Sequence, residues 1–125
     1  MVDEAIRDLI RDYRAALEER GVRVERIILF GSHAAGTPRC DSDMDLAVVS
    51  PDFGSDRFEE GKILFQTAWR IDPRIEPVPV ASAALERDTW QPLIHEILTN
   101  GIVLYAAPKT EDGRREMEDG GGASL

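Results

Sequence analysis

The first pattern along the chain is a stripe of apolar residues at helical spacing near the N-terminus. Between Asp3 and Arg20 the apolar side chains recur at intervals of three and four residues, at Ile6, Leu9, Ile10, Tyr13 and Leu17. This spacing places them on one face of a helix. Asp3 is suited to cap the start of that helix, and Gly21 is placed to end it. We therefore predict a helix over residues 3–20 that packs by one face.

Two strands are predicted on either side of a polar loop. The stretch 24–30 (VERIILF) ends in a nearly continuous apolar run, which is typical of a strand buried on both faces. The following stretch 31–42 (GSHAAGTPRCDS) is small, polar and turn-rich, and it predicts a loop or a short helix followed by a loop. The stretch 44–49 (MDLAVV) is predicted to be the second strand.

A second helix and an edge strand are predicted next. Residues 56–71 suit a helix with Gly61 as its weak point, and its apolar residues include Phe58, Leu64, Phe65, Ala68 and Trp69. Residues 74–80 (RIEPVPV) suit a third strand. Pro77 and Pro79 are two apart, so both remove a hydrogen-bond donor from the same side of that strand. This predicts a position at the edge of a sheet.

The remaining pattern completes a small domain. Residues 89–100 (TWQPLIHEILTN) predict a helix with Pro92 in its first turn and Asn100-Gly101 as its end. Residues 102–105 (IVLY) predict a short final strand. The order of elements indicates an α+β domain, a small mixed β-sheet packed with helices.

A domain over residues 1–107 and a tail over residues 108–125 are therefore expected. The tail is acidic and rich in glycine and has almost no apolar residues, so we predict that it is disordered.

Composition then narrows the classes of function. A chain of 125 residues is long enough for one domain. The net charge of −9 and the scattered basic residues argue against binding of a nucleic-acid backbone. No apolar run approaches about 18 residues, so no membrane-spanning helix is expected. The single cysteine, Cys40, predicts a reducing, cytoplasmic location.

Gly31-Ser32, directly after the first strand, is a candidate phosphate-binding turn. Glycine lets the backbone turn sharply and lets a ligand approach closely. The amides that follow would be free donors for phosphate oxygens. The same pair also suits an ordinary turn, so alone it does not assign a function.

Asp43 and Asp45 flank the start of the second strand. Side chains alternate along a strand, so both carboxylates are expected on one face, with Cα atoms roughly 6.5–7 Å apart. The alternate face, expected to pack in the core, carries Met44, Leu46 and Val48. Two adjacent carboxylates repel each other and favour a bound cation, here Mg²⁺ or Mn²⁺ because the ligands are oxygens. The alternative is a solvated Asp-x-Asp turn.

Several other side chains have structural explanations. Glu76, an acid within an apolar strand, suits an exposed edge charge that prevents aggregation. His95 is expected to be a packing or surface residue, and Trp69 and Trp90 are expected in the core or at an interface. None of these four residues indicates chemistry from its position alone.

The combination is more specific than its parts. Gly-Ser, ten intervening residues, and Asp-x-Asp running into a hydrophobic strand resemble the signature of the DNA polymerase β nucleotidyltransferase superfamily. Within it the chain is similar, over roughly residues 5–106, to the minimal nucleotidyltransferases. These are short cytoplasmic proteins that are often antitoxins paired with HEPN-domain toxins. The resemblance implies the nucleotidyltransferase fold.

The resemblance also implies roles for the residues. Gly31 and Ser32 would hold the nucleotide phosphates. Asp43 and Asp45 would ligate two Mg²⁺ ions, with Mn²⁺ as an alternative, and Glu76 would complete the catalytic metal site. Glu76 could also take the proton of an attacking hydroxyl, which displaces pyrophosphate from the α-phosphorus.

Two functions stay open. The first is metal-dependent transfer of a nucleoside monophosphate, AMP from ATP or its equivalent from another NTP, to a hydroxyl on a partner HEPN toxin. The alternative is a non-catalytic antitoxin that neutralises its partner by contact. The three carboxylates favour the first function. His33 and Ala35 favour the second, because many relatives have phosphate-binding arginines at these positions. An enzyme acting on small molecules is disfavoured because such enzymes usually carry a second domain.

Overall fold

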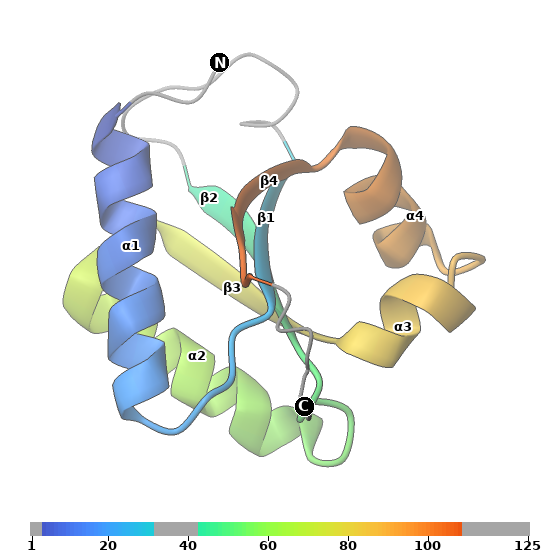
Figure 1. Cartoon of the computed structure of the whole chain (residues 1–125), viewed down its shortest axis with the longest axis horizontal. Helices are drawn as coiled ribbons and strands as arrows, with labels where there is room; N and C mark the ends of the chain where they lie inside the picture. Colours follow the sequence, from blue (N-terminus) through green and yellow to red (C-terminus); the bar gives the residue numbers. More distant parts are fainter. Residues whose placement is uncertain (1–3, 32–42, 109–125) are drawn as a thin grey trace, which may run out of the picture.

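The computed structural model describes residues 4–31 and 43–108 and contains four helices and four strands within them (Figure 1). In chain order these are α1 (Glu4–Glu19), β1 (Arg26–Phe30), β2 (Met44–Ser50), α2 (Arg57–Ile71), β3 (Ile75–Ala81), α3 (Ser82–Arg87), α4 (Pro92–Asn100) and β4 (Ile102–Ala106). The predictions outside the described residues concern Asp3, Ser32, His33, Ala35, Cys40 and the tail from residue 109.

The strands form one mixed sheet in the order β3-β2-β1-β4. Strand β1 pairs antiparallel with β2 and β4, and β2 pairs parallel with β3. The predicted α+β class with a mixed sheet is therefore confirmed. Strand β3 lies at an edge, as Pro77 and Pro79 predicted, because an edge strand needs backbone donors on one side only.

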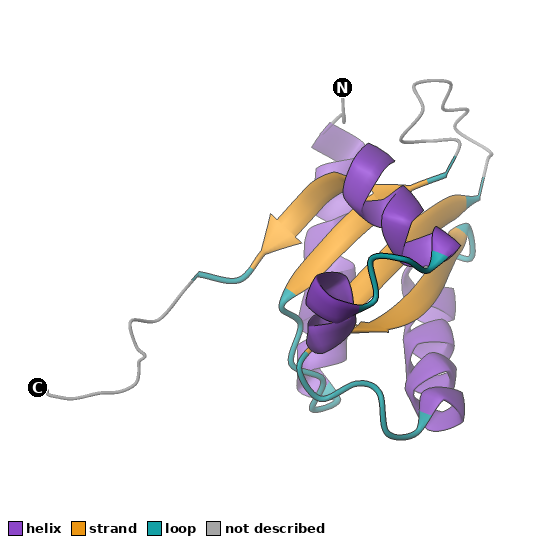
Figure 2. Ribbon diagram, turned by 90° about the vertical axis from the view of Figure 1, so that its right-hand side faces the viewer, coloured by secondary structure: helices purple, strands orange, loops and turns teal. Residues whose placement is uncertain are grey.

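Helices cover both faces of the sheet. The short helices α3 and α4 lie on the near side of the strands in Figure 2, and the longer helices α1 and α2 lie behind them. Helices α1 and α2 share one apolar core with Ile27, Leu29, Met44, Leu46 and Val48. Helices α3 and α4 share the other with Ile28, Phe30, Ala47 and Val49. Strand β1 is thus buried on both faces, as predicted, and alternate residues of β2 divide between the two cores.

Helix α1 packs by the predicted stripe. Ile10, Tyr13 and Leu17 are buried, and Gly21, with a φ of 88°, follows the end of the helix. The Tyr13 hydroxyl donates a 2.9 Å hydrogen bond to the backbone carbonyl of Leu64, which joins α1 to α2. Burial also raises the pKa of Tyr13, so this hydroxyl stays a donor.

One helix was not predicted, and the predicted start of another is wrong. Helix α3 was not predicted, since six residues are too short to show a helical repeat. Helix α4 begins at Pro92, not at residue 89, with proline in the predicted first turn.

Four of the larger aromatic side chains, Phe58, Phe65, Trp69 and Trp90, are exposed. For Trp69 and Trp90, expected in the core or at an interface, this excludes the core. Separately, none of the helices in residues 4–31 and 43–108 is long and apolar enough to cross a membrane.

Candidate functional site

Three acidic residues meet at one end of the β2–β3 pair. Because the two strands run parallel and in register, Asp45 lies directly beside Glu76. Asp43 precedes β2 by one residue, and Asp43 and Asp45 therefore point to the same side. A 2.8 Å hydrogen bond from the Met44 amide to the Arg74 carbonyl extends the pairing of the two strands at this end.

The charges of these carboxylates act on one another. A hydrogen bond with Asp43 is the main cause of a raised pKa at Glu76, followed by burial and by the negative charges of Asp43 and Asp45. Neighbouring carboxylates disfavour full ionisation of all three groups unless a cation compensates their negative charges. We call the group of Asp43, Asp45 and Glu76 the carboxylate edge.

Gly31 borders the carboxylate edge from β1. It directly follows Phe30, the residue paired with Asp45, and it has a φ of 77°. A β-carbon at Gly31 would overlap Oδ2 of Asp45 and lie 3.2 Å from its Cγ. The sequence predicted a sharp turn here but not this contact. The sequence signal for this contact was a glycine directly after the first strand, together with aspartates at the start of the next strand.

The chemistry of the carboxylate edge suits a hard cation. Its side chains supply only oxygen ligands, which Mg²⁺ and Mn²⁺ prefer. Within the two described stretches, however, no three acidic, histidine or cysteine side chains already form an arrangement able to hold an ion. Binding would require the three carboxylates to turn toward the ion, and Ser32, the remaining predicted site residue, lies outside the described residues.

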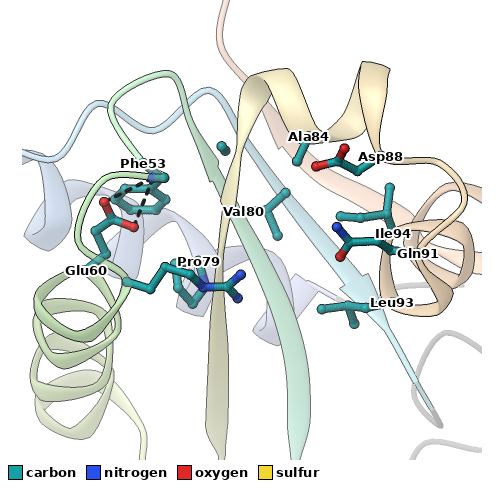
Figure 3. Close-up of a pocket in the computed structure, with 12 residues that line it drawn as sticks. Phe53, Glu60, Pro79, Val80, Ala84, Asp88, Gln91, Leu93 and Ile94 are labelled. Carbon is teal, nitrogen blue, oxygen red and sulfur yellow. Dashed lines mark hydrogen bonds between the residues drawn. The ribbon is translucent and has the colours of Figure 1, made fainter.

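A pocket of about 210 Å³ lies away from this edge, beside the other end of β3 (Figure 3). Val80 lines it four residues after Glu76, which is roughly 13 Å along an extended strand. Glu60, on its α2 side, accepts hydrogen bonds from the backbone amides of Gly54 and Asp56 and so holds the preceding loop. The pocket contains none of the predicted site residues, and the carboxylate edge remains the candidate for chemistry.

The sheet order, the helices on both faces and the carboxylate edge together define a domain of the nucleotidyltransferase class. The family described as "Polymerase beta, Nucleotidyltransferase" matches residues 14–110, and the chain belongs to this family. The predicted fold and the prediction of a nucleotidyltransferase are thereby confirmed. The roles of the individual site residues stay predictions.

Each individual relative matches only part of the chain. A candidate protein adenylyltransferase of Methanocaldococcus jannaschii is 35% identical over 83 residues, which is 63% of this chain and 56% of that protein. The chain thus spans little more than half the length of this curated relative. A candidate nucleotidyltransferase of Sulfolobus solfataricus, at 18% identity, has a TM-score of 0.50 over 85% of this chain and 90% of its own, and shows the same fold. A toxin–antitoxin complex with AMP-PNP is 23% identical, with a TM-score of 0.48 over 76% of this chain and 72% of its own.

Proposed function

We propose that this protein transfers AMP from ATP to a hydroxyl group of a partner protein in a metal-dependent reaction. The observation that carries this proposal is the carboxylate edge, in which Asp45 lies beside Glu76 on parallel strands and Asp43 is close enough to raise the pKa of Glu76. The relative from Methanocaldococcus jannaschii, by its name a candidate protein adenylyltransferase, supports a protein as the acceptor.

Each residue of the site has a distinct part in this proposal. Asp43, Asp45 and Glu76 would hold two Mg²⁺ ions, which when bound compensate the charge of the triphosphate. Gly31 leaves the backbone open to an approaching phosphate, and Ser32 would add a donor beside it. Glu76 accepts the proton of the acceptor hydroxyl. The hydroxyl oxygen then bonds to the α-phosphorus as the bond to the β-phosphate oxygen breaks, and pyrophosphate leaves.

The proposed acceptor is a HEPN-domain toxin, which would make this protein an antitoxin. The resemblance to minimal nucleotidyltransferases supports that pairing. The non-catalytic alternative, neutralisation by contact alone, is favoured by His33 and Ala35 in place of phosphate-binding arginines. The two candidates differ in whether pyrophosphate is produced when both proteins meet.

Release of pyrophosphate tests the proposal. The protein, ATP, Mg²⁺ and a HEPN-domain partner are expected to release pyrophosphate only when all four are present. Glu76→Gln should abolish release because it keeps the shape of the side chain and removes its charge. Glu86→Gln, an exposed acid on α3, is the matched control and should retain release. Equal release by wild type and Glu76→Gln would refute the assigned role of Glu76.

A further inference from the structure

The outward face of α2 carries a row of exposed aromatic side chains. Phe58, Phe65 and Trp69 are 77%, 57% and 67% exposed. Together with Lys62 they recur at intervals of four, three and four residues, so all four lie along one line of the helix. We call Phe58, Lys62, Phe65 and Trp69 the aromatic row.

Turning the aromatic row inward would expose the buried face of α2. The opposite face of α2 buries Leu64, Thr67 and Ala68, and the Tyr13 hydroxyl holds the carbonyl of Leu64. The outward face also has a shallow hollow of about 330 Å³, lined by Lys62, Phe65, Gln66 and Trp69. Single exposed apolar residues are ordinary, but a contiguous aromatic row of this kind marks a protein interface.

Charges beside the row make it complementary to itself. Glu59 lies near the start of α2 and Arg70 near its end, both exposed and on the same flank of the row. When two identical helices pack antiparallel about a two-fold axis, the same flanks face each other. Glu59 then meets Arg70 of the second copy, and the reciprocal pair forms as well. In the same register Phe58 meets Trp69, and Lys62 meets the ring of Phe65 in a cation–π contact.

We propose that a second copy of this chain binds the aromatic row, forming a homodimer through antiparallel α2 helices. Helix α2 covers the face of the sheet opposite α3 and α4 (Figure 1), whereas Asp45 alternates onto the α3–α4 side with Ala47. The carboxylate edge therefore stays accessible in the dimer. This inference does not depend on the proposed function.

The size of the aromatic row sets the expected affinity. From Phe58 to Trp69 the row spans roughly 16 Å of helix. A single pair of helices of this length falls at the small end of specific interfaces, so dissociation is expected at micromolar concentrations. The oligomeric state must therefore be followed over about 1–200 µM protein, around that dissociation constant.

Analytical ultracentrifugation of the full chain tests the interface. Wild type should pass from monomer to dimer over this range, and Trp69→Glu should stay monomeric. Trp90→Glu is the matched control, since Trp90 is 75% exposed but lies outside α2. Far-UV circular dichroism confirms that both variants fold. A wild type that is monomeric throughout, including one whose aromatic row binds a different protein, overturns the proposal, as does a dimeric Trp69→Glu.

A charge exchange tests the antiparallel register. Glu59→Arg and Arg70→Glu should each weaken the dimer about tenfold, because two symmetric surface pairs are lost and replaced by repulsion. The double variant restores both pairs with the charges exchanged and should return to nearly wild-type dissociation. A double variant as weak as the two single variants would overturn the register.

Discussion

Gly31 and Asp45 are packed so closely that no β-carbon fits between them. The glycine ends β1 in a left-handed conformation, and the aspartate carboxylate occupies the space that a side chain at position 31 would need. The shape of the backbone and the position of a carboxylate are thus set by the same contact. This contact makes Gly31 a direct neighbour of the carboxylate edge, whether or not a phosphate binds there.

Gly31→Ala is therefore expected to destabilise the fold and displace Asp45. The strained φ alone costs about 1–3 kcal/mol, and the overlap with Asp45 adds to it. The measurement is the free energy of unfolding in urea. Gly61→Ala is the control, because Gly61 lies in α2 with no atom near its added β-carbon, and it should stabilise by about 0.5–1 kcal/mol. Equal effects of the two substitutions would contradict the described conformation of Gly31.

Tyr13→Phe should weaken the junction of α1 and α2. The substitution removes the hydroxyl that donates to the Leu64 carbonyl in the core, at a cost of about 0.5–1.5 kcal/mol. Tyr105→Phe is the matched control, since Tyr105 is half-buried and contacts Arg14 through its ring. Urea unfolding of both variants provides the comparison. Unchanged stability of Tyr13→Phe would show that this hydrogen bond contributes nothing.

Much of the fold was predictable because its signals are local. The helical stripe of α1, the apolar run of β1 and the prolines of β3 each lie within a few adjacent residues, and each predicted its element correctly. The orientation of α2 was not predictable in this way. Its apolar residues cover more than one face, and long-range contacts such as that between Tyr13 and Leu64 decide which face is buried.

The site residues also differ in whether a local pattern could predict their positions. Alternation along a strand placed Asp43 and Asp45 on one side from the sequence alone. The position of Glu76 beside Asp45 depends on parallel pairing between strands separated by a helix, which no local pattern encodes. Only the resemblance to a family suggested it.

An ion pair at the opposite end of the sheet predicts a specific dependence on pH. Arg23 donates to both carboxylate oxygens of Asp52, at 3.1 and 2.9 Å, and these hydrogen bonds lower the pKa of Asp52. A lowered pKa in the folded state adds stability above the ordinary aspartate value of about 3.9. That contribution is lost as the pH falls through the lowered value.

Asp52→Asn should therefore melt slightly below wild type at neutral pH. The difference should vanish in acid and shrink in high salt, because the pair is exposed. Melting temperatures of both proteins across pH 2–7 provide the measurement. A difference that grows toward acid would have the wrong sign for this interaction.

Divalent metal should stabilise the protein through the carboxylate edge. A ligand that binds only the native state raises the melting temperature by mass action. Mg²⁺ or Mn²⁺ is expected to do so for wild type but not for the Asp43→Asn/Asp45→Asn double variant. Asp88→Asn, at the pocket beside the other end of β3, is the control and should keep the effect. Equal stabilisation of wild type and the double variant would show that Asp43 and Asp45 do not bind the metal.

Intact-mass measurement of the partner protein shows whether this protein transfers AMP to it. The protein is incubated with a HEPN-domain partner, Mg²⁺ and millimolar ATP, and complex formation is followed in the same samples by gel filtration. The partner is expected to gain the mass of at least one AMP with wild type and none with Glu76→Gln, although both form the complex. A partner that forms the complex with wild type and gains no AMP would contradict catalysis and favour neutralisation by contact.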